Sequence, residues 1–200
     1  MGFTLVEILV VVTIIGILLA LVVPAVTRAL TKSQQATDVS NAKQLGTILL
    51  AEAVENNGVY PTTDTANPPQ PLTTSTQLCN TLIQKDLLTD AKVVTGRGST
   101  PLSGNTIVAG NVAFGYVSGL TTSDNGRLPL LFTRDTTVTI AANTVTYGNI
   151  AANPWGGSGV AVFMVGNSAE FIKPAQVGDA TIAIPLVGKP APLTTTVLQP

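Results

Sequence analysis

The residue types that most often carry out catalysis are scarce in this chain. It contains no His and a single Cys, Cys79, so most nucleophile–base pairs and most zinc sites are unavailable. The motifs of a nucleophile elbow, a phosphate-binding loop and a dinucleotide fold are missing from the sequence. The composition still allows an active site built on Lys or carboxylates, but no motif indicates one. We therefore predict that the protein is not an enzyme.

One acid lies where a charge is costly. Glu7 is the only charged residue among the first 27, and from Ile8 to Thr27 the chain contains no Asp, Glu, Lys or Arg. About 20 apolar residues, at about 1.5 Å each, are long enough to cross a bilayer as a helix. A carboxylate beside such a run needs a partner once it leaves water. We expect Glu7 to meet a cationic group in a helical assembly, with attraction to the helix dipole as the alternative.

The residues around Glu7 form a specific pattern. Only Met1 precedes Gly2, then comes Phe3-Thr4-Leu5-Val6-Glu7, and Gly16 and Pro24 follow within the apolar run. This contiguous stretch resembles the amino terminus of the type IV pilin superfamily. It departs from that family because pilin leaders usually carry Lys or Arg before the Gly. A secretory signal peptide, with a basic start and a shorter apolar core, and an ordinary membrane anchor are the alternatives.

The resemblance implies a processing site and an assembly site. Prepilin peptidase would cleave after Gly2 and leave Phe3 as an N-methylated amino terminus. Glu7 would pair with the amino group of Phe3 in the same or the next subunit, which selects the correct stagger between helices. Small residues such as Gly16 allow helices to approach closely, and Pro24 predicts a kink or local unwinding. We also predict that the helix melts between Gly16 and Pro24 on assembly.

The helical pattern continues beyond the apolar run. From Ala25 to Asn56 apolar residues recur mostly at spacings of three and four, which is typical of an amphipathic helix. We predict a leader remnant at residues 1–2 and one helix over residues 3–56. Residues 3–27 would form the transmembrane segment or filament core, and residues 28–56 would be amphipathic.

Two features after the apolar run affect this helix. Gly46 is expected to be a weak point that costs about 1 kcal/mol relative to Ala. Asn56-Asn57-Gly58 is expected to end the helix, because Gly takes the left-handed conformation of a C-cap without strain.

A loop region with a short helix is predicted over residues 57–90. Asn57-Gly58-Val59-Tyr60-Pro61-Thr62-Thr63 resembles the segment after the stem helix in the major pseudopilins of type II secretion. There Tyr60 would dock against the head and Pro61 would begin a fixed extended path. Thr76–Leu88 reads as a helix with Thr76 as its cap.

The remainder, residues 91–200, is predicted to be a β-rich globular head. Turns are expected at Ser123–Gly126, Ala142–Asn143 and Gly166–Ser168, and Gly188–Pro200 is expected to be a partly ordered tail. The apolar alternation predicts strands near Lys92–Thr95, Thr106–Val108, Val112–Ser118, Leu128–Thr133, Thr137–Ala141, Thr144–Tyr147, Val160–Val165, Ala169–Ile172 and Thr181–Leu186.

The only Trp lies in a segment with its own resemblance. Asn153-Pro154-Trp155-Gly156-Gly157 is similar to the D-P-W-G segment of the same pseudopilins, with Asn in place of the acid. We expect Pro154 and Trp155 to be structural residues between the sheet and a loop. The acids nearby are scattered, so no metal ligand is assigned; no cofactor is expected, and Ca²⁺ remains the alternative. Cys79 is alone and is expected to be a buried hydrophobe without a disulfide.

Composition limits the function classes further. Charged residues make up 10% of the chain and its formal net charge is −1, so we expect no strong nucleic-acid binding. Frequent Thr, Gly and Pro are more typical of an extracellular coat than of an enzyme. The predicted fold class is α+β and pilin-like: a long N-terminal hydrophobic α-helix, the stem, packed on a C-terminal antiparallel β-sheet head.

The function expected from these features is structural. The protein would be a subunit of an extracellular type IV pilus-like filament, a helical homo-oligomer. Its precursor would lie in the inner membrane, where prepilin peptidase and the pilus assembly machinery would act on it. The alternatives are the major pseudopilin of a periplasmic type II secretion pseudopilus, a minor tip pilin that acts as a binding module, and a membrane-anchored extracytoplasmic enzyme.

Overall fold

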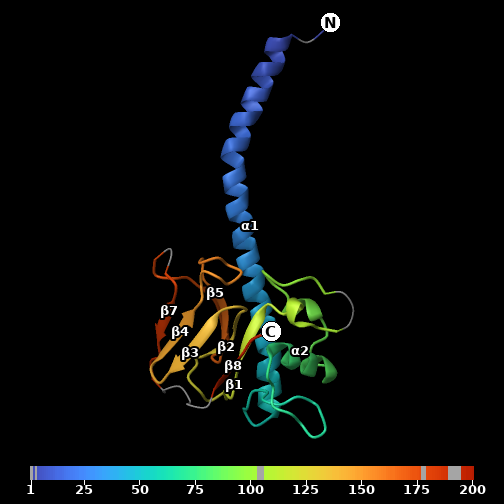
Figure 1. Ribbon diagram of the computed structural model, residues 1–200, viewed down its shortest axis with the longest axis vertical. Coiled ribbons are helices and arrows are strands. Elements are labelled where there is room, and N and C mark those ends of the chain that lie inside the picture. Colours follow the sequence, from blue (N-terminus) through green and yellow to red (C-terminus); the bar gives the residue numbers. More distant parts are fainter. Residues whose placement is uncertain (1, 3, 103–105, 177–178, 189–194) are drawn as a thin grey trace. The chain divides into compact units, whose positions relative to one another are not determined.

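The computed structural model describes residues 2, 4–102, 106–176, 179–188 and 195–200 (Figure 1). The chain forms two compact units, Met1–Ala36 and Thr37–Pro200. Helix α1 (Leu5–Glu55) supplies the first unit and the opening residues of the second, which we call the head. The predicted α+β class is confirmed, because one long apolar amino-terminal helix is followed by antiparallel sheets.

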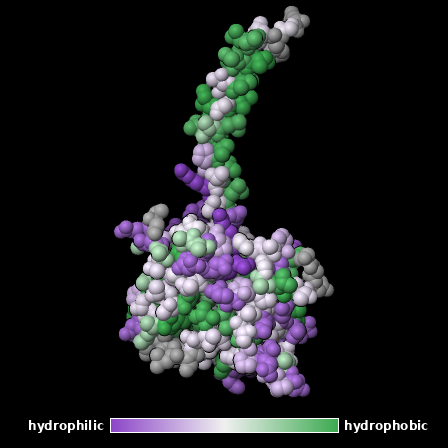
Figure 2. Space-filling view, viewed as in Figure 1, coloured by the Kyte–Doolittle hydropathy of each residue, from purple (hydrophilic) through white to green (hydrophobic). Residues whose placement is uncertain are grey.

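The first unit is a mainly apolar helix. Every large apolar side chain from Leu5 to Leu30 is exposed, and Figure 2 shows that hydrophobic residues make up most of the surface of this part of α1. By length and composition, α1 is able to cross a membrane. Helical hydrogen bonds satisfy the backbone internally, which is the condition for a chain segment to enter lipid.

Helix α1 stays regular at Pro24 and ends where the sequence predicts. Pro24 is assigned to the helix without a break in this single chain. After Glu55 the backbone turns left-handed, with φ of 55° at Asn57 and 82° at Gly58. The Gly58 N–H donates to the Ala53 carbonyl at 2.7 Å, which closes the helix with a left-handed cap.

The β-strands of the head form two antiparallel sheets. The five-stranded sheet has the order β6-β5-β2-β1-β8, with β1 at Phe114–Ser118, β2 at Pro129–Thr133, β5 at Val160–Met164, β6 at Ser168–Ile172 and β8 at Thr196–Leu198. The three-stranded sheet has the order β3-β4-β7, with β3 at Thr137–Ala141, β4 at Thr144–Gly148 and β7 at Ile182–Pro185. In Figure 1, the head part of α1 and α2 (Ser75–Gln84) lie on the side of the five-stranded sheet away from β3, β4 and β7.

The core of the head forms where α1 meets the five-stranded sheet. Ala42, Leu45, Leu49 and Ala53 are fully buried at helical spacing. Strands β1, β2 and β5 are buried at all five positions, because both of their faces are covered. Strand β3 instead alternates between exposed and buried residues, as a strand with one wet face does.

The short helix begins and ends earlier than predicted. The sequence favoured Thr76–Leu88 with Thr76 as the cap, but α2 covers Ser75–Gln84. Its cap is Thr74, whose backbone is extended and whose hydroxyl accepts from the Gln77 N–H at 3.2 Å. The left-handed backbone of Asp86, with φ of 56°, ends the helix before the two leucines that extended the apolar pattern.

Two predicted strands were wrong. Lys92–Thr95 lies largely in a 3-10 helix, η1 (Ala91–Val94), whose first turn is capped by the Asp90 carboxylate. Thr106–Val108 has no strand assignment and leads into a second 3-10 helix, η2 (Ala109–Asn111). Short β-branched runs with apolar residues fit a buried turn as well as a strand, so their pattern did not separate the two.

Strand β8 was not predicted. Its residues pair antiparallel with β1 at the end of the five-stranded sheet. The Gln199 carbonyl then accepts from the Ser75 N–H at 3.0 Å, and the Gln199 side-chain amide donates to the Thr136 carbonyl at 2.7 Å. These contacts tie the carboxy-terminal residues to the start of α2 and to the chain before β3.

Candidate functional site

Glu7 is held by its own helix terminus. The Thr4 N–H and hydroxyl each donate to one Glu7 carboxylate oxygen, Oε2, at 2.8 Å. The Glu7 N–H in turn approaches the Thr4 hydroxyl oxygen at 3.3 Å. This reciprocal arrangement is a capping box, and the spacing of Thr4 and Glu7 in the sequence was the signal for it. The carboxylate therefore has local partners in the single chain and keeps its second oxygen, Oε1, for another donor.

The proposed processing residues precede α1. Gly2 is exposed and has no regular secondary structure, and Phe3 lies outside the described residues. A side chain at Gly2 would meet nothing within 4 Å in this chain. The structure thus leaves Gly2 accessible, and the partner expected for Glu7, the Phe3 amino group, remains a prediction.

Gly16 and Pro24 lie on the exposed part of α1. A Cβ at Gly16 would meet nothing within 4 Å, so Gly16 has no packing role within the single chain. The Thr27 hydroxyl donates to the Pro24 carbonyl at 3.0 Å, and the Thr13 hydroxyl donates to the Leu9 carbonyl at 2.7 Å. These hydroxyls are satisfied along the helix, which reduces the cost of placing them in an apolar environment.

Tyr60 and Pro61 dock the chain after α1 against β1. Tyr60 is 1% exposed and its N–H donates to the Leu120 carbonyl at 3.2 Å. The Pro61 carbonyl accepts from the Tyr116 hydroxyl at 2.7 Å. Burial raises the pKa of Tyr116 well above its ordinary value, so the phenol stays a neutral donor. Tyr60 and Pro61 therefore both fix the chain that follows α1 to β1 and to the residues just after it.

Trp155 and Pro154 pack against a loop from another part of the head. The Arg97 guanidinium lies 4.7 Å from the centre of the Trp155 ring, and the Phe171 ring meets Trp155 edge-on at 5.1 Å. Gly98 has φ of 82° and approaches Pro154 so closely that a Cβ there would lie 2.5 Å from its ring. The predicted position of Trp155 between a loop and a strand agrees with these contacts.

Asp38 is a buried acid that the sequence reasoning missed, because no motif surrounds it. It lies on α1 in the head, is 4% exposed, and accepts from the Arg97 N–H at 3.2 and 3.3 Å. Burial raises the pKa of Asp38 to about 6, and the Arg97 N–H and charge limit the rise. The Trp155 indole N–H also lowers the pKa of Asp38. Among the described residues, no acceptor lies at hydrogen-bonding distance and angle from this indole N–H.

Asp38→Asn is expected to stabilise the head at neutral pH. The folded chain holds the proton more tightly than the unfolded chain, so the contribution of Asp38 to stability falls as the pH rises from 3.8 to about 6. At about 1.4 kcal/mol per pH unit, that loss is on the order of 3 kcal/mol. Thermal unfolding of the full chain in detergent should give Asp38→Asn a higher Tm than wild type at neutral pH, with little difference in mild acid.

A matched variant separates the charge from the hydrogen bond. Asp38→Ala removes the oxygens that accept from Arg97, so its Tm should fall below that of wild type in mild acid and stay below that of Asp38→Asn throughout. Identical pH dependence in wild type and Asp38→Asn would contradict the assignment of this effect to Asp38.

The described residues contain no group of three or more His, Cys, Asp or Glu side chains that could hold a metal ion. Cys79 is buried on α2, as predicted, and burial raises the pKa of its thiol to about 12. Such a thiol is protonated at neutral pH and is a weak nucleophile.

The sequence-predicted residues fall into two separate groups. Gly2, Glu7, Gly16 and Pro24 belong to the first unit, where an exposed apolar helix offers helix-to-helix packing. Tyr60, Pro61, Pro154 and Trp155 belong to the head, where they make intrachain contacts. The chain matches no protein-family model, no curated protein and no solved structure.

Proposed function

We propose that this protein is a structural subunit of an extracellular filament of the type IV pilus kind. The observation that carries the proposal is the apolar surface of α1, where every large apolar side chain from Leu5 to Leu30 is exposed. Such a surface is stable in water only when a membrane or other helices cover it. The precursor would lie in the inner membrane, and the filament would bury the same surface between subunits.

The start of α1 supports an ordered assembly rather than simple anchoring. In a membrane anchor, an acid in the first turn stabilises the helix terminus by only about 0.3–1 kcal/mol, whereas in a polymer the charge also gives specificity, because it must meet its partner. Glu7 keeps Oε1 for such a donor after the Thr4 capping bonds engage Oε2. In the proposed assembly, the donor to Glu7 is the amino group of Phe3. Prepilin peptidase creates this amino group by cleavage after Gly2, and it is then methylated.

Sheared surface material tests the proposal directly. Cells carrying the full gene are sheared, and intact-mass analysis determines the amino terminus of this chain in the released fraction. We expect an abundant species that begins at methylated Phe3. The proposal that this protein is a filament subunit would be refuted by a chain that still begins at Met1 or is found only in the membrane fraction. Polymers confined to the periplasm would instead identify the pseudopilus alternative.

A further inference from the structure

The head has a polar pocket that the proposed filament does not use. It lies between α2 and the loop at residues 64–66 and has a volume of about 320 Å³. Apart from one Ala, its lining consists of Asp64, Thr65, Gln77, Asn80, Thr81 and Gln84. Its volume is at the lower end of the range for ligand sites, about 300–1,000 Å³, and suits a single small ring.

Asp64 and Gln77 are each fixed at one end by hydrogen bonds within the protein. One carboxylate oxygen of Asp64, Oδ1, accepts from the N–H groups of Ala66 at 3.0 Å and Gln70 at 2.8 Å. The Gln77 side-chain carbonyl accepts from the Thr73 N–H at 2.8 Å and from its hydroxyl at 2.9 Å. Asp64 therefore keeps Oδ2 as an acceptor, and Gln77 keeps its amide NH₂ as a donor.

Asn80 and Gln84 are also each fixed at one end of the side-chain amide by a hydrogen bond within the protein. The Asn80 NH₂ donates to the Ile107 carbonyl at 3.0 Å, and the Gln84 side-chain carbonyl accepts from the Thr65 hydroxyl. Among the described residues, the Asn80 carbonyl and the Gln84 NH₂ have no further hydrogen bond. The pocket thus presents both acceptors and donors on side chains that are already oriented, which lowers the entropic cost of binding.

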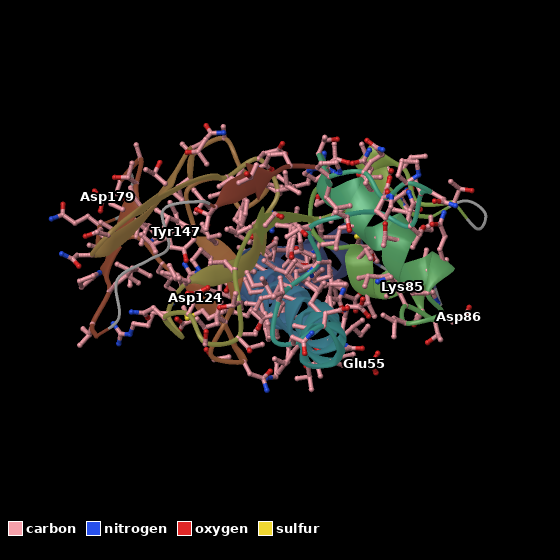
Figure 3. The ribbon with its side chains drawn as sticks, turned by 90° about the horizontal axis from the view of Figure 1, so that it is seen from below. Glu55, Lys85, Asp86, Asp124, Tyr147 and Asp179 are labelled. Carbon is pink, nitrogen blue, oxygen red and sulfur yellow. The ribbon has the colours of Figure 1, made fainter. Side chains whose placement is uncertain are left out.

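The charge of the pocket restricts its ligand. Asp64 is the only charged residue in the lining. The next residue after Gln84, Lys85, points its ammonium to Glu52 of α1 and forms an ion pair there. In Figure 3, Lys85 and Asp86 lie at the α2 side of the head, away from Tyr147 and Asp179. A pocket with a carboxylate and no cation disfavours anions, while mixed donors and acceptors match a ring that carries several hydroxyl groups.

We propose that this pocket binds one neutral hexose unit of a glycan. Asp64 and Asn80 accept from sugar hydroxyls, and the Gln77 and Gln84 amides donate to them. Thr81 is 3% exposed and lies on the lining, where its hydroxyl is able to bond to the ring. The lining contains no aromatic side chain for stacking, so the affinity for a single sugar is in the millimolar range, as a few net hydrogen bonds allow.

Saturation-transfer NMR on the full chain tests the proposal without requiring filaments. The protein is held in dodecylphosphocholine, which carries no sugar headgroup, and is offered D-glucose, D-galactose, D-mannose and N-acetyl-D-glucosamine in turn. N-acetylneuraminic acid serves as the anionic control. We expect transfer to at least one neutral sugar and none to the anionic sugar.

Three variants decide whether this pocket is responsible. Thr81→Val and Asp64→Asn should each weaken binding about tenfold, since each removes one hydrogen bond to the ligand. Thr89→Val makes the same chemical change at an exposed position outside the lining and should bind as wild type does. If Thr81→Val lowers the Tm, Asp64→Asn at the rim carries the test alone. The proposal is overturned if no neutral sugar receives saturation, if the anionic sugar binds equally, or if the pocket variants match Thr89→Val.

Discussion

Glu7→Ala should remove this protein from the cell surface while the processed chain accumulates in the membrane. Loss of the carboxylate makes α1 more apolar, so insertion into the membrane is unaffected or improved. The filament, however, loses the group that selects the stagger between neighbouring helices. We expect at least about a tenfold fall in the ratio of sheared to membrane-bound chain, measured by quantitative mass spectrometry.

Two companion variants identify which property of Glu7 matters. Glu7→Gln keeps an oxygen for the Thr4 donors but has no charge, so filaments should be lost as they are in Glu7→Ala. Thr4→Ala removes the capping hydroxyl and leaves the acid, so filaments should persist. If Thr4→Ala reproduces the loss, the capping box and not the interchain pair is the function of Glu7. Filaments at wild-type level in Glu7→Ala would contradict both functions of Glu7, the capping box and the interchain pair.

Gly46→Ala is expected to destabilise the head, although Ala is normally the better helix residue. A Cβ at Gly46 would lie 2.3–2.4 Å from three atoms of the Phe163 ring on β5. Phe163 is fully buried, and the Lys43 ammonium lies 5.5 Å from its ring centre. The ring has no open space to enter, so the clash outweighs a propensity gain of about 1 kcal/mol.

The expected loss for Gly46→Ala is about 2 kcal/mol, or roughly 4–8 °C in the Tm of the head. Gly16→Ala is the matched control, because the same change on the same helix meets nothing within 4 Å. Its Tm should equal that of wild type or exceed it. In Gly46→Ala/Phe163→Leu, the smaller side chain should recover part of the loss, so the two changes are not additive. An unchanged Tm for Gly46→Ala would contradict the close contact between Gly46 of α1 and Phe163 of β5.

Local patterns in the sequence were sufficient for the elements whose signal is periodic. The apolar run and the spacing of Leu45 and Leu49 predicted α1, and Asn57-Gly58 predicted its end. Seven strands were predicted from short apolar, β-branched runs bounded by turn residues, and in β3 the alternation also reflects two faces with different solvent exposure. Tyr60 and Trp155 were correctly expected to be buried, because large aromatic side chains beside Pro and Gly tend to fill gaps between loops and sheets.

Other features were decided only by contacts between distant parts of the chain. Strand β8 exists because β1 offers an unpaired edge, and a strand of three residues, Thr-Val-Leu, is too short to show a period of its own. Asp38 is buried in the head, and the N–H that satisfies its carboxylate comes from Arg97, far away in sequence. Gly46 appeared to be a weak point of a helix until the tertiary structure brought Phe163 against it.

The contrast between features set by the local sequence and features set by the tertiary structure is clearest when the amino-terminal half of α1 is compared with the head. Its sequence by itself determined an apolar helix with one acid, since helix formation and hydropathy are local properties. The head was different, because the pairing of β8 with β1 and the close approach of α1 to β5 depend on residues that are distant in the chain. Lys43 and Asn167, which form a hydrogen bond, are 124 positions apart. No local pattern encodes the geometry of such a contact, so only the folded chain decided it.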